Sequence, residues 1–477
     1  MASRQEATRR HWLETIERYR FDADRAGGEA MWSPRLDGAS RDELTAIQNA
    51  KLAALTPFLY ENSDFYRRRF DRLGLAPTDI CGIDDLAKWP VVDKGEMAED
   101  ALLHPPYGTY STMSEALWAE RGWMMFSSSG TTGTPRVFRY SQLDRELWAW
   151  ANARALMAMD FRHGDTVFMI TGYGPHVWAW GVQYALNKMG LPLIPGGGMD
   201  GRARAGIIQR FQPTVLLCTP SYALYLGRLL QELGHEPRDT KVRLLFVGGE
   251  PAVGIDRTRE RIQDLWGARI VEFYGCTEAA PHVGGYSCPA AASAGAPVFA
   301  HLMEDVQIWE TVDPETRAVQ SPGLRGLTVC TNLNSESSPQ LRFLVGDYAV
   351  FEQSRCACGR SHVRAMGCFT GRADDLINLR GIKMFPAQIE AAVRSLGDIG
   401  DEYEVLLTTN ADGLDVMTLR VEHVAFDAPA AVAGRLRDAV RTHLEIRADV
   451  EVLRPGTLPK TEFKARRIND RRDKGGR

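Results

Sequence analysis

Residues 126–141, FSSSGTTGTPRVFRYS, are the segment of the sequence best suited to binding a polyanion. Hydroxyl side chains and backbone N–H groups are dense there, and Gly130 and Gly133 let a backbone approach a ligand closely. The Gly-Lys-Ser/Thr ending of a Walker motif is absent, because TPR stands at 134–136. On these residues alone, a phosphate-binding loop and an ordinary polar surface loop both remain open.

A second segment, YGCTEAAP at 274–281, follows the apolar run RIVEF at 269–273. Ligands bind at the carboxyl ends of strands in open α/β sheets, so this is a suitable position for a site. Tyr274 offers a flat face to a purine, Thr277 a hydrogen bond to a phosphate, and Glu278 an oxygen ligand for Mg²⁺. Taken by itself, a Tyr-Gly pair at a strand end is more often a packed turn.

A third segment, RCACGR at 355–360, places the thiols of Cys356 and Cys358 one residue apart. Eight cysteines in 477 residues are too sparse for a disulfide scaffold. Two close thiols suit a tetrahedral zinc if two further ligands are available, whereas buried thiols are also commonly inert.

The elements around these segments indicate an α/β protein. Short apolar runs at 166–170, 214–218, 243–247 and 269–273 alternate with helix-compatible stretches, which predicts parallel β-α units. The first 100 residues favour helices and loops, and 300–350 favours an antiparallel subdomain. After Gly371 the composition changes to that of a small α+β module. We therefore expect a large N-terminal domain with several subdomains and a small C-terminal domain.

Composition excludes several classes of protein. The chain is 44% hydrophobic and 25% charged, as soluble globular proteins are, and its net charge of −4 gives no general attraction to nucleic acid or anionic lipid. There is no apolar run of 18 residues, and the N-terminal residues lack the apolar core of a signal peptide. We expect a cytoplasmic protein with neither nucleic acid nor membrane as partner.

Five segments occur together in an order that resembles the adenylate-forming superfamily, and in detail its phenylacetate–CoA ligase branch. They are SSSGTTGTPR (127–136), YGCTE (274–278), VGDY (345–348), GRADDLINLRGIKMFPAQIE (371–390) and LPKTEFKARR (458–467). The resemblance implies an adenylation domain over residues 1–373 and a mobile lid domain over 374–477. It also implies an ATP- and Mg²⁺-dependent enzyme that converts a carboxylic acid to acyl-AMP, releases pyrophosphate, and passes the acyl group to a thiol, usually that of CoA.

The resemblance assigns a role to individual residues. Lys464 would bridge the carboxylate and the α-phosphate, Asp374 would be the hinge, and Thr277 and Glu278 would serve the α-phosphate and Mg²⁺. The other residues expected to bind ATP or AMP are Ser127, Ser128, Ser129, Gly130, Thr131, Thr132, Gly133, Gly249, Glu250, Pro251, Tyr274, Gly275, Asp347 and Arg372. Thr134 stands where many members carry lysine, so we expect Arg136 to substitute for that cation. Without the resemblance, Lys464 would be one more charge in a basic tail and Asp347 a solvated turn residue.

The acyl pocket and the metal ligands follow from the same resemblance. The expected pocket residues are Tyr173, His176, Trp178, Trp180, Gly181, Ala279, Pro281 and His282. Their aromatic rings favour a flat acid, although aromatic residues at such spacing are more often core. Pro281 and His282 depart from the glycine-rich sequence usual in the branch, which favours a substituted or polar aryl acid. Cys288 and His301 would complete the zinc ligand set with Cys356 and Cys358.

Two alternative functions remain open from the sequence. In the first, the acyl-AMP passes to a carrier-protein thiol, an amine or another small nucleophile instead of CoA. In the second, the chain is a catalytically silent nucleotide-binding relative, which the presence of Lys464, Glu278 and Asp347 argues against. A homodimer is among the expected assemblies.

Overall fold

The computed structural model describes residues 3–20, 31–127, 136–174, 177–250, 254–279, 283–292, 298–369, 371–380, 382–410, 414–460 and 467–472. The chain divides into two compact units, one formed by residues 1–197 and 271–369 and the other by residues 198–270 and 370–477. Among the described residues, no helix combines the length and the apolar character needed to cross a bilayer.

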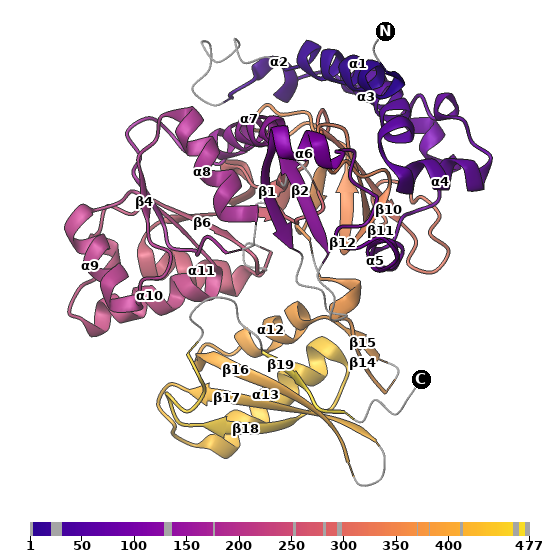
Figure 1. Cartoon of the computed structure of the whole chain (residues 1–477). Helices are drawn as coiled ribbons and strands as arrows, with labels where there is room; N and C mark the ends of the chain where they lie inside the picture. The colour runs from indigo at the N-terminus through magenta and orange to yellow at the C-terminus, as the bar shows by residue number, and fades with distance from the viewer. Residues whose placement is uncertain are drawn as a thin grey trace. The chain divides into compact units, whose positions relative to one another are not determined.

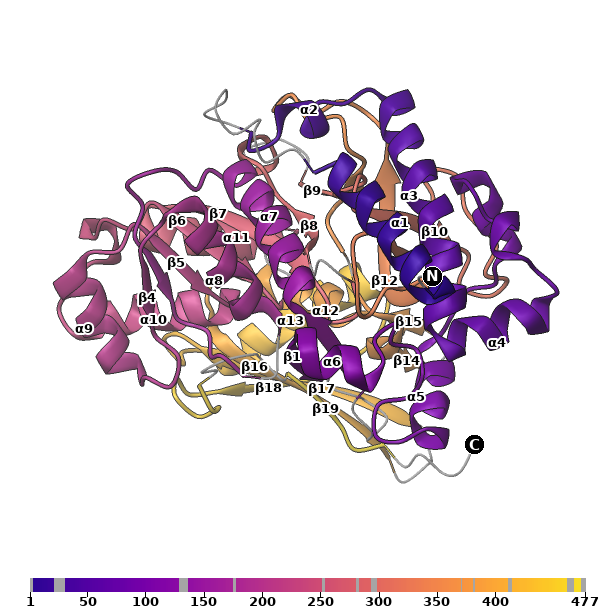
Figure 2. The ribbon, with the colours of Figure 1, turned by 45° about the horizontal axis from the view of Figure 1, so that its top comes forward.

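The first unit begins with helices, as the sequence predicts. They are α1 (Arg4–Arg18), α2 (Pro34–Asp37), α3 (Arg41–Asn62), α4 (Asp64–Leu73) and α5 (Lys94–Leu103). A capping box between Ser40 and Glu43 starts α3, and its apolar residues at helical spacing are buried. Helices α1 and α3 lie side by side, with Trp12 stacked on Phe58 at a ring-centroid distance of 5.2 Å (Figures 1 and 2).

A β-hairpin and two long helices follow. Helix α6 (Glu115–Arg121) leads into the antiparallel pair β1 (Gly122–Ser127) and β2 (Val137–Ser141). Ser141 ends β2 and also caps α7 (Gln142–Ala158), since its side chain accepts a hydrogen bond from the Asp144 N–H. Helix α8 (Val177–Met189) lies beside α7 (Figure 2).

The main sheet has eleven strands in the order β10-β11-β12-β13-β9-β8-β7-β6-β5-β3-β4. Strands β3 and β4 are parallel, as are β5 and β6, whereas β10, β11 and β12 are antiparallel. The predicted parallel β-α units and the predicted antiparallel subdomain at 300–350 are therefore both confirmed. In the first unit the strands are β3 (Val167–Met169), β4 (Leu193–Pro195), β8 (Val283–Tyr286), β9 (Phe299–His301), β10 (Gln307–Val312), β11 (Arg325–Asn332), β12 (Phe343–Glu352) and β13 (Arg364–Met366), with β7 (Arg269–Gly275) spanning the unit boundary.

The second unit contains one β-α segment and the C-terminal module. The segment comprises α9 (Gly201–Phe211), β5 (Val215–Cys218), α10 (Pro220–Glu232), β6 (Leu244–Gly248) and α11 (Asp256–Trp266). The module packs α12 (Pro386–Arg394) and α13 (Pro429–Leu444) with a sheet of order β18-β17-β16-β19. The strands of this sheet are β16 (Ile399–Thr409), β17 (Asp415–His423), β18 (Asp449–Leu453) and β19 (Ile468–Asp470). A separate antiparallel pair, β14 (Ile377–Leu379) and β15 (Ile382–Met384), precedes α12. This confirms the predicted small α+β module.

Candidate active site

The predicted phosphate loop is bounded by the β1–β2 hairpin. Ser127, the last residue of β1, pairs with Val137, the first residue of β2. The loop between them therefore begins and ends at one pair of adjacent strand ends. Ser127 is described, whereas Ser128, Ser129, Gly130, Thr131, Thr132 and Gly133 lie outside the described residues.

Arg136, just after this loop, forms a buried ion pair with Glu278. The guanidinium Nη2 donates to Glu278 Oε1 at 3.0 Å, and the two side chains are only 7% and 8% exposed. The sequence suggested that Arg136 replaces a phosphate-binding cation, but the guanidinium lies against the predicted Mg²⁺ ligand. Glu278 Oε1 is occupied in this way, and Oε2 has no hydrogen-bond partner among the described residues. The carboxylate thus keeps one oxygen of the kind that Mg²⁺ prefers.

Two side chains that the sequence did not indicate hold the YGCTE segment by its backbone. The Tyr140 hydroxyl of β2 donates to the Thr277 carbonyl at 2.6 Å. The Asn332 amide at the end of β11 donates to the Glu278 carbonyl at 2.8 Å. Two backbone carbonyls of the segment are therefore held by side-chain donors from β2 and β11.

Tyr274 and Asp347, predicted to bind adenine and ribose, lie together. Gly275 ends β7 directly after Tyr274, and the Tyr274 hydroxyl donates to the Asp347 carboxylate of β12. One face of the Tyr274 ring stacks on Phe369, with centroids 3.5 Å apart and planes 11° apart. Phe369 was not indicated by the sequence, and it leaves at most the opposite face of Tyr274 for a purine.

The described residues of the predicted acyl pocket lie on or near α8. Trp180 meets the ring of Tyr173 edge-on at 4.9 Å, and its indole N–H donates to the Gly174 carbonyl at 3.3 Å. Trp180 packs against a buried apolar cluster that contains Ala279 and also receives Tyr274. Of the other predicted residues, Trp178 is half-buried, Gly181 is buried, and His176, Pro281 and His282 lie outside the described residues.

The remaining predicted nucleotide residues belong to the second unit. Gly249 follows β6 with a φ of +82°, a conformation that glycine adopts easily. The Glu250 carboxylate accepts hydrogen bonds from the Ser221 hydroxyl at 2.6 Å and from its backbone N–H at 3.2 Å. Arg372 is exposed and precedes a 3₁₀ turn at Ala373–Asp375, which includes the predicted hinge, Asp374. Pro251 and Lys464 lie outside the described residues.

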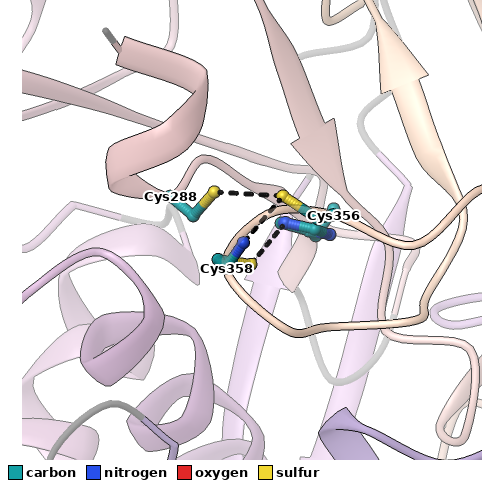
Figure 3. A group of neighbouring side chains, drawn as sticks. Cys288, Cys356 and Cys358 are labelled. Carbon is teal, nitrogen blue, oxygen red and sulfur yellow. Dashed lines mark hydrogen bonds between the residues drawn. The ribbon is translucent and has the colours of Figure 1, made fainter.

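The four predicted zinc ligands come together in the first unit. The ligand atoms of Cys288, His301, Cys356 and Cys358 all lie within 4.8 Å of one another. Cys288 Sγ is 3.9 Å from Cys356 Sγ (Figure 3). Cys358 Sγ is 3.4 Å from His301 Nε2. Zn–S bonds of about 2.3 Å place tetrahedral sulfur ligands about 3.8 Å apart. The donor set and the spacing therefore fit a tetrahedral zinc.

Two of the four side chains, His301 and Cys358, have pKa shifts that favour their metal-binding forms, whereas the pKa values of Cys288 and Cys356 are raised by their hydrogen bonds to neighbouring thiols and by burial. Burial lowers the pKa of His301, which favours the neutral imidazole that binds metals. Hydrogen bonds from Cys288 and then Cys356 lower the pKa of Cys358, which favours its thiolate. The Arg360 guanidinium lies 3.7 Å from Cys358 Sγ, where it compensates negative charge.

Comparison with known proteins gives the family. Residues 84–327 match the family described as AMP-binding enzyme, and residues 381–472 match the AMP-binding enzyme C-terminal domain. A phenylacetate–coenzyme A ligase of Pseudomonas putida is 31% identical over 458 residues, which span 94% of this chain and 98% of the relative. A phenylacetate–coenzyme A ligase of Thermus thermophilus is 29% identical over 462 residues, which span 93% of this chain and all of the relative.

A solved structure extends the similarity to the fold. 2-Hydroxyisobutyryl-CoA ligase, in the postadenylation state with 2-HIB-AMP, matches with a TM-score of 0.85 and 26% identity over 93% of both chains. The same ligase with 2-HIB-AMP and CoA, in its thioesterification state, matches with a TM-score of 0.70. The resemblance inferred from the five segments is thus confirmed, and the chain belongs to the AMP-binding enzyme family, where phenylacetate–coenzyme A ligases are similar to it over almost its whole length.

Proposed function

We propose that this protein is an AMP-forming acid–thiol ligase that activates a carboxylic acid with ATP and transfers the acyl group to CoA. The observation that supports this most strongly is the similarity to phenylacetate–coenzyme A ligases over more than nine-tenths of the chain. The juxtaposition of Tyr274 with Asp347, and of Arg136 with Glu278, supports a nucleotide site in the first unit.

The reaction has two steps. A carboxylate oxygen attacks the α-phosphorus of ATP, forming a P–O bond while pyrophosphate leaves with the bonding electrons. A thiolate then attacks the acyl carbon, forming the thioester while AMP leaves. The enzyme contributes charge neutralisation and alignment more than covalent chemistry.

Residues of the first unit would hold the nucleotide. Tyr274 would offer the ring face opposite Phe369 to adenine, and Asp347 would offer a carboxylate oxygen to the ribose hydroxyls. Glu278, with Thr277, would serve the α-phosphate and hold Mg²⁺, a hard cation that neutralises phosphate charge when it is bound. Ser127 and the loop after it would hold the outer phosphates.

Further roles are assigned, by resemblance to the family, to residues of the second unit. Gly249 and Glu250 would line the adenine slot, and Arg372 would contact the ribose. Lys464 would stabilise the charge that develops between carboxylate and α-phosphate, because a flexible ammonium can be delivered by a moving domain. Residues 374–477 would form that domain, with Asp374 as its hinge.

We infer an aryl acid as substrate from the aromatic residues around α8. A panel of aryl and short aliphatic acids, incubated with ATP and Mg²⁺ with and without CoA, tests the whole proposal by mass analysis. We expect an aryl-AMP in both incubations and an aryl-CoA only with CoA. Adenylate without thioester would point to a carrier-protein thiol or another acceptor, faster turnover of aliphatic acids would contradict the aryl assignment, and no adenylate from any acid would contradict the function.

We also propose that Cys288, His301, Cys356 and Cys358 bind a structural zinc. Three observations support this: the donors are three thiols and an imidazole, their spacing fits a tetrahedron, and three of the four side chains are buried. A filled site of this kind, with no place for water, stabilises a fold instead of activating a substrate.

Metal analysis of the purified protein tests the zinc. We expect about one zinc per chain and its loss in the Cys356→Ser variant, together with a lower unfolding midpoint. Cys218→Ser, which changes a buried thiol of β5 outside the cluster, should keep the metal. Protein that contains no zinc when expressed with zinc present, or Cys356→Ser protein that retains it, would contradict the proposal.

A further inference from the structure

The loop between β11 and β12 buries an unusual run of polar side chains. Residues 334–338, NSESS, are at most 3% exposed, and Asn332 just before them is fully buried. We call residues 332–338 the polar loop. Burying polar groups costs free energy unless each finds a hydrogen-bond partner, so the partners identify what this loop holds in place.

The first partner is the end of the hairpin that bounds the predicted phosphate loop. The Ser338 hydroxyl donates to the Arg139 carbonyl of β2 at 2.8 Å, and the Ser337 hydroxyl oxygen lies 2.8 Å from the same carbonyl oxygen. The Ser141 N–H donates to the Ser337 hydroxyl at 3.1 Å. The polar loop therefore fixes the strand through which the phosphate loop returns to the fold.

A buried carboxylate strengthens this attachment. Asp144 of α7 accepts hydrogen bonds from the backbone N–H groups of Glu336 at 2.7 Å and Ser337 at 3.1 Å. It also accepts from the Ser337 hydroxyl and from the Ser141 N–H at 3.0 Å. One carboxylate thus joins the polar loop to the end of β2, and charge-assisted hydrogen bonds of this kind are strong.

The second partner is the YGCTE segment. The Asn332 side chain donates to the Glu278 carbonyl at 2.8 Å. The polar loop therefore contacts both segments assigned to ATP, which are far apart in the sequence. Its hydrogen bonds set the separation between the hairpin that carries Arg136 and the strand end that carries Glu278.

We propose that the polar loop is a positioning element for ATP, in which Asn332 and Ser337 are positioning residues that set Glu278 and the end of β2 relative to each other. The proposal rests on the proposed function, since it concerns that nucleotide site. Misplacement of catalytic groups by about 1 Å can cost two orders of magnitude in rate, so a rigid buried linkage is needed where two loops share one ligand.

Asn332→Ala and Asn334→Ala form a matched pair of test variants. Both remove a buried asparagine from the polar loop, but Asn334 contacts Lys51 of α3, at 2.9 Å, instead of a nucleotide segment. We expect both variants to unfold at lower urea concentration. Only Asn332→Ala should raise the KM for ATP, by about tenfold, which corresponds to about 1.4 kcal/mol, and neither should change the KM for the acid.

Equal KM values for ATP in the two variants would overturn the proposal. Should Asn332→Ala not fold, Ser337→Ala gives the same test against Thr331→Val, which removes a buried hydroxyl that accepts only from the Arg342 N–H at 3.0 Å among the described residues. The affinity for a non-hydrolysable ATP analogue, measured by calorimetry on the same proteins with Mg²⁺, tests the inference without turnover, and it should fall in Asn332→Ala but not in Asn334→Ala. Wild-type protein that binds the analogue but releases no pyrophosphate from ATP would contradict the proposed function and leave this comparison intact.

Discussion

The buried ion pair between Arg136 and Glu278 allows the loss of stability on removing one partner to be predicted. Both side chains are more than nine-tenths buried and their charged atoms lie 3.0 Å apart. Removing one partner leaves the other charge buried without compensation, which costs about 3–5 kcal/mol, whereas an exposed pair is worth at most about 1 kcal/mol. We expect Arg136→Met to lower the free energy of unfolding by about 3–5 kcal/mol.

A double-mutant cycle separates this effect from a simple change of packing. Urea unfolding at pH 7 would be measured for Arg136→Met, Glu278→Gln and the double variant. The double variant leaves no unpaired charge, so it should be more stable than the sum of the single losses predicts, by about 2 kcal/mol or more. Strictly additive losses, or a loss below about 1 kcal/mol for Arg136→Met, would refute the reasoning. The single variants should also lose pyrophosphate release, because each disturbs the group assigned to Mg²⁺.

Three further predictions concern single positions. Burial raises the pKa of Asp305, but its ion pair with Arg154 outweighs burial and lowers it from 3.8 to about 2. The pair therefore contributes about 2 kcal/mol to the free energy of unfolding above pH 4, and this contribution is lost as the pH falls toward 2. Asp305→Asn should remove this acid-dependent part of the urea midpoint. An unchanged acid dependence in the variant would refute the prediction. Tyr274→Phe removes the hydrogen bond to Asp347 and should raise the KM for ATP, measured by pyrophosphate release, by about three- to tenfold. The free energy of unfolding, measured in urea, should change by about 1 kcal/mol or less. An unchanged KM for ATP would contradict the assignment of Tyr274 to the nucleotide site. Lys464→Ala should slow formation of acyl-AMP by at least about a hundredfold while thioester formation from supplied acyl-AMP and CoA persists, and equal slowing of both half-reactions would contradict its assigned role.

The strands were predictable because their signal is local. The runs at 166–170, 214–218, 243–247 and 269–273 are mostly apolar, and they correspond to β3, β5, β6 and β7. A strand buried on both faces needs such a run whatever its neighbours are. The small C-terminal module was predictable for the same reason, from alternating strands around one amphipathic helix.

The zinc ligands show what a resemblance adds. The two thiols of RCACGR are visible in the sequence, but nothing local connects them to Cys288 or His301, which lie on other strands and turns. The similarity to the phenylacetate–CoA ligase branch supplied that connection, and the four side chains do lie together. The presence of the metal stays a prediction.

The polar partners within the site were not predictable. A run such as NSESS indicates an exposed loop, because polar residues are usually exposed. Its burial depends on Asp144 and Arg139, almost 200 positions away. The partner of Arg136 was missed for a similar reason, since Glu278 lies 142 positions further along the chain. Only the folded chain decides which polar groups satisfy one another.

The transfer of oxygen from acid to AMP tests the central claim most directly. The carboxylic acid would be labelled with ¹⁸O in both oxygens, incubated with the protein, ATP, Mg²⁺ and CoA, and the AMP and inorganic phosphates analysed by mass. Attack of the carboxylate on the α-phosphorus predicts one ¹⁸O in each AMP and none in pyrophosphate. Label in inorganic phosphate with formation of ADP, or unlabelled AMP, would contradict it.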